Sequence, residues 1–230
     1  MKKLILLFGL SLFIFSCGDN EEDKNTNVWV STEYYENGEL KSETSYKGDK
    51  ENGLYIKNGI YKEYYENGQL KYETNFKEGK ENGIEKGYYE NGQLKYETNF
   101  KEGKENGIEK GYYESGQLEY ETYLKDGKEN GIYKKYYENG QLSFEVNIVN
   151  DKENGIYKDY YESGQLKFEV NIMNDKKNGI QKEYYESGEL KCEIPFIDGE
   201  ENGVEKVYYK NGQLKSEITY KDGEVIEEIK

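Results

Sequence analysis

The sequence predicts an all-β protein, an elongated single-layer antiparallel β-meander of about eight hairpin repeats of 24 residues. The first observation is a fixed period, which is typical of repeat architectures. A Tyr-Tyr pair recurs along the chain, followed after two intervening residues by Gly, then by Gln or Glu, and then by Leu. These pairs begin at Tyr34, Tyr64, Tyr88, Tyr112, Tyr136, Tyr160, Tyr184 and Tyr208, and the last seven starts are spaced by 24 residues. The second observation is that each period holds two short alternating segments with turn residues between them.

One period illustrates the predicted hairpin. Residues 84–89 and 94–100 are rich in aromatic and β-branched side chains, and Asn91-Gly92 joins them. An Asn-Gly join between two such segments is the strongest short-range signal for a β-hairpin. A second glycine-containing turn follows at residues 103–107 and leads into the next unit. The glycines Gly92, Gly103 and Gly107 are therefore assigned to turns.

Two turn geometries are compatible with this hairpin. Asn91 is replaced by Ser in three units while the following glycine never changes, which favours a three-residue loop with a glycine bulge because Ser tolerates positive φ poorly. A two-residue type I′ turn stays open, because it would place Lys86 opposite Glu97. A one-residue slip would turn every side chain over. With the bulge, one face is expected to carry Ile84, Tyr88, Leu94, Tyr96, Thr98 and Phe100, and the other Glu85, Tyr89, Lys95 and Glu97.

The array is expected to span residues 28–230 and to end in polar units. The column through Tyr96 reads Ser42, Tyr72, Tyr96, Tyr120, Phe144, Phe168, Cys192 and Ser216. Serine at both ends is typical of the capping units of a repeat protein. Leu94, Tyr96 and Phe100 are assigned as the packing residues of the unit. The six extra residues between the first two tyrosine pairs fall around 54–59 and predict an additional turn.

The amino terminus has the pattern of an export signal. Lys2-Lys3 precede an apolar run that ends at Phe15, which is too short for a membrane-spanning helix and predicts a signal peptide over residues 1–16. The run before Cys17 resembles the lipobox of bacterial lipoproteins, although Phe15 departs from its usual small residue. The resemblance implies lipidation of Cys17 and location at the cell envelope as an outer-membrane lipoprotein, with surface exposure as a further expectation. After Cys17 the chain is polar, acidic and without apolar periodicity, which predicts a flexible tether over residues 17–27. The alternative is an ordinary secretory signal with an incidental cysteine.

Charge limits the partners. The chain has a net charge of −15 and contains neither Arg nor His, and loss of residues 1–16 would bring the charge to −17. Phosphate recognition normally uses clustered basic residues, so nucleic acid is not expected as a partner. The acidic body would also be repelled by anionic lipids, so membrane attachment would depend on the lipid at Cys17.

No residue pattern predicts catalysis, a cofactor or a metal. Glu97 recurs once per unit as Glu43, Glu73, Glu121, Glu145, Glu169, Glu193 and Glu217, but equivalent carboxylates do not form the differentiated pair of an active site. The loops at Asn150-Asp151 and Asn174-Asp175 carry Lys among the would-be calcium ligands. Without His, a Cys-His or Ser-His nucleophile is impossible. A non-enzymatic protein is expected.

The unit resembles the bacterial variant of the MORN repeat. In residues 96–107 the aromatic, Gly-Lys and final Gly positions fall in register with that pattern, with Thr98, Phe100 and Asn106 as departures. The resemblance covers about residues 34–223 and implies a meander of hairpins that acts as a scaffold for a protein partner. Some similar proteins are named YwqK-family antitoxins of toxin–antitoxin systems, so an antitoxin or immunity-type role is one alternative.

The second tyrosine of each pair is expected to point outward and to form an interaction surface. The residues are Tyr65, Tyr89, Tyr113, Tyr137, Tyr161, Tyr185 and Tyr209. Tyrosine offers contact area at low entropic cost together with a hydrogen-bonding tip, which suits protein or glycan partners. Binding of a protein partner is the first expectation, glycan binding is the other alternative, and self-association is a further expectation.

Overall fold

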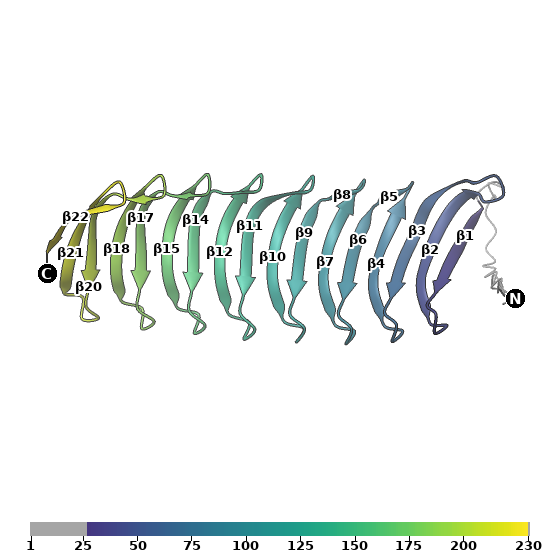
Figure 1. Cartoon of the computed structure of the whole chain (residues 1–230), viewed down its shortest axis with the longest axis horizontal. Coiled ribbons are helices and arrows are strands. Elements are labelled where there is room, and N and C mark those ends of the chain that lie inside the picture. Colours follow the sequence, from purple (N-terminus) through teal and green to yellow (C-terminus); the bar gives the residue numbers. More distant parts are fainter. Residues whose placement is uncertain (1–26, 230) are drawn as a thin grey trace, which may run out of the picture.

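The computed structural model describes residues 27–229, and every regular element in that range is a strand of one open antiparallel sheet. The strands lie side by side across the long axis of the molecule, in chain order, from β1 at one end to β22 at the other (Figure 1). The predicted single-layer meander of about eight hairpin units is confirmed. The predicted signal peptide, Cys17 and almost all of the acidic tether lie outside the described residues, as does Lys230.

The strands of the amino-terminal half are β1 (Val28–Tyr34), β2 (Leu40–Asp49), β3 (Leu54–Tyr64), β4 (Leu70–Lys77), β5 (Lys80–Glu81), β6 (Gly83–Tyr88), β7 (Leu94–Lys101), β8 (Lys104–Glu105), β9 (Gly107–Tyr112), β10 (Leu118–Lys125) and β11 (Lys128–Tyr136). Those of the carboxy-terminal half are β12 (Leu142–Val149), β13 (Lys152–Glu153), β14 (Gly155–Tyr160), β15 (Leu166–Met173), β16 (Lys176–Lys177), β17 (Gly179–Tyr184), β18 (Leu190–Ile197), β19 (Glu200–Glu201), β20 (Gly203–Tyr208), β21 (Leu214–Lys221) and β22 (Glu224–Ile229).

The loop between β6 and β7 is the predicted three-residue loop. The backbone N–H of Tyr89 donates to the carbonyl of Gln93 at 2.8 Å, and the N–H of Gly92 donates to the carbonyl of Tyr89 at 2.9 Å. Gly92 has φ of 84°, a left-handed conformation that costs glycine no steric penalty. Tyr88 pairs with Leu94, as the glycine bulge requires.

A second irregularity follows directly after this loop. The register shifts between Tyr88 and Gly87, so that Gly87 pairs with Tyr96 and Lys86 pairs with Glu97. The Lys86–Glu97 pairing had favoured a two-residue turn, yet the structure combines it with the three-residue loop. Two successive bulges restore the phase that one bulge alone would have shifted.

The second bulge overturns part of the predicted face assignment. Glu85 pairs with Thr98 and shares the face of Tyr96 and Phe100, whereas Ile84 pairs with Asn99 on the opposite face. The hydroxyl of Tyr88 reaches the carboxylate of Glu73, the equivalent of Glu97, which also places Tyr88 on that opposite face. Leu94 pairs with Tyr88 and so lies on the same face as Tyr88. The predictions for Ile84, Tyr88, Leu94 and Glu85 were therefore wrong, because side-chain parity changes at each bulge.

The two faces differ strongly in burial. The face of Tyr96, Thr98 and Phe100, here called the packed face, holds the buried apolar side chains of the molecule: Leu124, Val146, Ile148, Val170, Ile172, Cys192 and Phe196. The face of Ile84, Lys86 and Glu97, here called the open face, leaves its isoleucines about half exposed. Neighbouring side chains on the packed face bury one another, so a single layer suffices to form a core.

The turn between β7 and β8 is a two-residue turn with positive φ at both central residues. Glu102 and Gly103 have φ of 53° and 80°, and Asn150 and Asp151 have 51° and 64° at the equivalent turn, which is the type I′ conformation. The N–H of Gly103 donates to the carbonyl of Glu81 in the preceding unit at 2.8 Å. The loop at Asn150 is thus a hairpin turn that links units.

Candidate functional site

The second tyrosine of each pair connects one unit to the next. The hydroxyl of Tyr89 donates to the backbone carbonyl of Tyr112 at 2.8 Å. The same bond, at 2.6 to 2.9 Å, joins Tyr35 to Tyr64, Tyr65 to Tyr88, Tyr113 to Tyr136, Tyr137 to Tyr160, Tyr161 to Tyr184 and Tyr185 to Tyr208. Tyr209 belongs to the last pair and is 49% exposed. Most of the predicted interaction tyrosines therefore use their hydroxyls within the array, and their role as an interaction surface stays a prediction.

From Tyr64 onward, the first tyrosine of each pair donates a hydrogen bond to the recurring glutamate of the preceding unit. The hydroxyl of Tyr112 donates to Oε1 of Glu97 at 3.2 Å. The equivalent bonds run from Tyr64 to Glu43, Tyr88 to Glu73, Tyr136 to Glu121, Tyr160 to Glu145, Tyr184 to Glu169 and Tyr208 to Glu193. Burial, reinforced by the hydrogen bond to Glu73 and its charge, raises the pKa of Tyr88 to about 12. The carboxylate row thus has a structural partner in every one of these units.

The open face carries one exposed aliphatic side chain per unit. The members of this aliphatic row, which are 43–57% exposed, are Val30, Ile60, Ile84, Ile108, Ile132, Ile156, Ile180 and Val204. Shallow hollows lie between successive members, one bordered by Ile60 and Ile84 and another by Ile132 and Ile156. From Ile60 onward the 24-residue spacing of the row was present in the sequence, but Ile84 had been assigned to the face of Tyr96 and Phe100.

Comparison with known families identifies the repeat. The model of the MORN repeat variant matches residues 30–47, 57–78, 81–102, 105–126, 129–150, 153–174, 177–198 and 201–222. The chain belongs to the MORN repeat variant family. A crystal structure of a porin-like protein from Bacteroides uniformis ATCC 8492 shares 10% identity over 90% of this chain and 89% of that chain, but its TM-score of 0.20 supports no argument. No curated protein matches the chain.

On the packed face of this MORN array, Glu85 is the carboxylate whose surroundings come nearest to those of a catalytic acid. Glu85 accepts hydrogen bonds from the hydroxyls of Tyr72 and Tyr96, and burial raises its pKa although both hydroxyls oppose the shift. The ring of Tyr96 lies over Gly87, where a Cβ would come within 2.2 Å of its Cε1. In the next unit the hydroxyl of Tyr120 donates to Glu109 at 2.7 Å. A repeated carboxylate–phenol contact indicates a packing element, since an active site needs a differentiated pair.

Farther along the MORN array, aromatic rings replace this carboxylate. Tyr120, Tyr133, Phe144, Tyr157 and Phe168 stack in succession with ring centroids 5.5 to 5.9 Å apart. Offset stacking of this kind adds to the stabilisation that burial provides. Cys192 continues the column, and burial raises the pKa of its thiol to about 12, so the thiol packs as a small apolar group.

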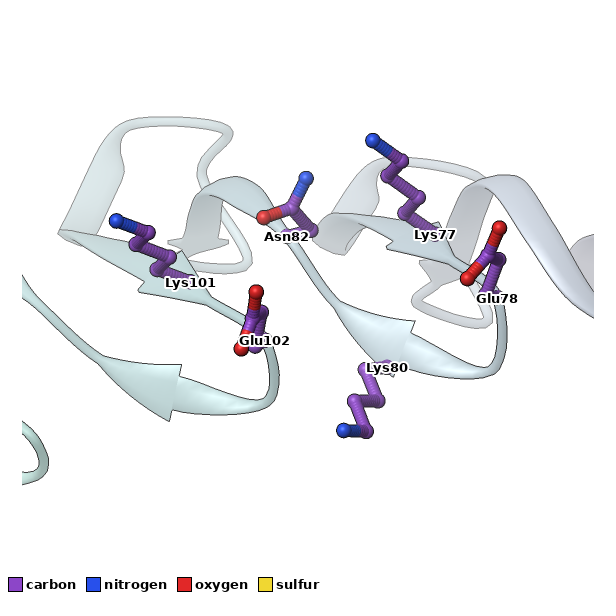
Figure 2. A pocket seen from close by; sticks show the side chains of 6 residues that line it. All are labelled: Lys77, Glu78, Lys80, Asn82, Lys101 and Glu102. Atoms are coloured by element: carbon purple, nitrogen blue, oxygen red, sulfur yellow. The ribbon is translucent and has the colours of Figure 1, made fainter.

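A hollow at the two-residue turns of the MORN array is lined by residues of both charges. Its lining residues are Lys77, Glu78, Lys80, Asn82, Lys101 and Glu102. Figure 2 shows Lys77 and Lys101 extending in similar directions from successive turns while Lys80 points the other way. These side chains do not converge on a common point, so the hollow offers no organised anion site.

Over residues 27–229 no cluster of three or more His, Cys, Asp or Glu side chains could hold a metal ion. Within the same range no helix has the length and apolar character needed to cross a bilayer.

Proposed function

We propose that this MORN protein is a non-enzymatic scaffold, anchored at the bacterial cell envelope by a lipid on Cys17, whose open face binds a protein partner. The observation that carries the proposal is the difference between the two kinds of recurring side chain. The tyrosines and glutamates that could do chemistry are bonded to one another or to the backbone, whereas the aliphatic row remains exposed in every unit. Large exposed apolar surfaces on soluble proteins mark interaction sites.

The anchor is tested by replacing the cysteine. We expect Cys17→Ala to lose membrane association, because the acidic body has no basic patch to hold it on an anionic bilayer and the lipid would be its only attachment. Fractionation of cells with immunoblotting of the membrane pellet measures this, and Cys192→Ala serves as the control cysteine. Recovery of Cys17→Ala in the pellet at the wild-type level would exclude the lipid anchor. A wild-type chain found in the cytoplasm would favour the antitoxin-type alternative.

Partner binding is tested on the open face. We expect the combined variant Ile84→Lys, Ile108→Lys and Ile132→Lys to lose at least about ten-fold in partner capture, because a charge placed in an apolar contact must be desolvated without a matching group. Capture is measured by crosslinking in intact cells followed by affinity purification and mass spectrometry. The matched control is Leu54→Lys, because Leu54 is 74% exposed but lies outside the aliphatic row.

Three results are informative in this experiment. Loss of capture in the triple variant with retention in Leu54→Lys supports the proposal. Equal capture by the triple variant and by Leu54→Lys would show that the partner binds a surface other than the aliphatic row. Retention of a purified glycan by the wild type and by the triple variant, with no captured protein, would favour the glycan-binding alternative and the tyrosine pairs.

A further inference from the structure

The open face becomes broader and more apolar in the carboxy-terminal half of the array. Val149, Met173 and Ile197 occupy equivalent positions at the ends of β12, β15 and β18 and are 40%, 52% and 55% exposed. The same position is Lys77, Lys101 and Lys125 in the earlier units, at the ends of β4, β7 and β10. Together with the neighbouring members of the aliphatic row they form the C-terminal patch, defined as Ile132, Val149, Ile156, Met173, Ile180 and Ile197.

The sheet register brings the two columns of this patch together. Ile156 pairs with Asn171, and Met173 lies two residues beyond Asn171 on the same face of β15. Ile180 pairs with Pro195, and Ile197 lies two residues beyond it on β18. The patch is thus a continuous surface in which Pro195 and short Asn side chains separate the aliphatic groups.

A balanced row of charges borders the patch. Lys134, Glu145, Lys158, Glu169, Lys182 and Glu193 follow one another on successive strands, each opposite the next. Lys158 and Glu145 form an ion pair at 3.8 Å. The six side chains of this row carry no net charge, although the whole chain carries a charge of −15, and Lys152 and Lys176 lie opposite Val149 and Met173 at the edge of the patch.

An alternating row of this kind is complementary to itself. A second copy related by a two-fold axis that runs parallel to the strands, midway between two neighbouring strands, places its lysines over the glutamates of the first. The second copy also brings the same spacing between its aliphatic side chains, about 9.6 Å for two strands. Aliphatic groups of one sheet can then fit between those of the other, as they do when two sheets pack about 10 Å apart.

We propose that the C-terminal patch binds the same patch of a second copy of this chain, with the two sheets face to face about a two-fold axis. Such an interface is isologous, since each copy contributes the same residues. Lys77, Lys101 and Lys125 confine it to the carboxy-terminal half, because in the earlier units these lysines would be desolvated against like charges. The inference rests on the proposed function only in using the open face, and it does not depend on the lipid anchor.

The first test changes the patch to the sequence of the earlier units. Val149→Lys, Met173→Lys and Ile197→Lys reproduce residues that the array already holds at this position, so the combined variant is expected to fold as the wild type does. Sedimentation equilibrium of the purified full chain over roughly 1–200 µM, the range of weak and transient interfaces, should show a dimer. We expect its dissociation constant to rise at least about ten-fold in the triple variant and to be unchanged in Leu54→Lys.

The second test locates the interface on the molecule. Met173 is the only methionine besides Met1, and an exposed methionine is readily oxidised to the sulfoxide. In the wild type, oxidation of Met173 by peroxide should slow as concentration rises through the dimerisation range. Dimers formed through residues 1–26 would leave Met173 equally reactive at all concentrations.

Three outcomes would overturn the inference. The first is a wild type that stays monomeric over the whole concentration range. The second is a combined Val149→Lys, Met173→Lys and Ile197→Lys variant that associates as the wild type does. The third is a rate of Met173 oxidation that does not change with protein concentration. A monomeric chain that still captures a cellular protein through Ile84, Ile108 and Ile132 would reject self-association while leaving the proposed scaffold in place.

Discussion

Deletion of residues 88–111 should leave a folded, β-rich protein with a modestly lower melting temperature. The deletion removes one full period and joins Gly87 to Tyr112, which are the equivalents of two adjacent residues in a single unit. The hydroxyl of Tyr65 then meets the carbonyl of Tyr112, and the two-residue turns keep their link to the preceding unit. The free energy of unfolding of such an array is close to the sum of the contributions of its units and of the interfaces between neighbouring units. Removal of one unit therefore removes the contribution of that unit and of one interface.

Deletion of residues 88–99, half a period, should instead unfold the surrounding region. It removes the three-residue loop and most of β7, so that every later strand would enter the sheet in the wrong direction for its partner. Circular dichroism with thermal melting compares the two deletions directly. If the full-period deletion is unfolded, the units are not interchangeable; if the half-period deletion melts like the wild type, the antiparallel order of the sheet is wrong.

Raising the pH above about 10 should unfold the array in a cooperative transition. Burial is the largest cause that raises the pKa of Tyr64, Tyr88, Tyr136, Tyr160 and Tyr220 to about 12, and the facing glutamate adds to the shift through its charge and its hydrogen bond. Above pH 10 the unfolded chain releases these phenolic protons while the folded chain retains them. Stability therefore falls as pH rises through the interval between 10 and 12.

The transition is measured by tyrosinate absorbance and far-ultraviolet circular dichroism in the same titration. Both signals should change together and steeply, with more than one proton released per molecule that unfolds. Refolding should follow when the pH is returned to neutrality. A smooth tyrosine titration near pH 10 with an unchanged dichroism spectrum would show that these hydroxyls are not held by their glutamates.

The repeat unit and the meander could be predicted because the signals are local: a fixed period, alternating segments and an invariant turn glycine at positions such as Gly92. The side-chain faces could not be predicted from alternation, since the second bulge changes the parity between Tyr88 and Gly87. Two signals that had seemed to exclude each other, the invariant glycine and the Lys86–Glu97 pair, are both satisfied.

The candidate surface was missed for a related reason. Ile84 was counted among the packing residues, so its row could not be recognised as exposed. The tyrosine bonds were missed because they join residues 23 positions apart, such as Tyr89 and Tyr112, and a repeat shows equivalence between such residues but not contact. Both errors arose because the exposed face of a residue and its contacts with the neighbouring unit depend on the strand register as well as on the residue types.

The orientation of the strands across the long axis has a mechanical consequence (Figure 1). The two chain ends of the sheet lie at opposite extremities, so tension between them would load the hydrogen bonds of the outermost strand in a peeling geometry. Units would detach one after another, and each 24-residue unit would lengthen the molecule by roughly 70 Å, the difference between its extended contour and its width in the sheet. Under load the array would behave as an extensible tether that yields in equal steps and reforms when the force is released.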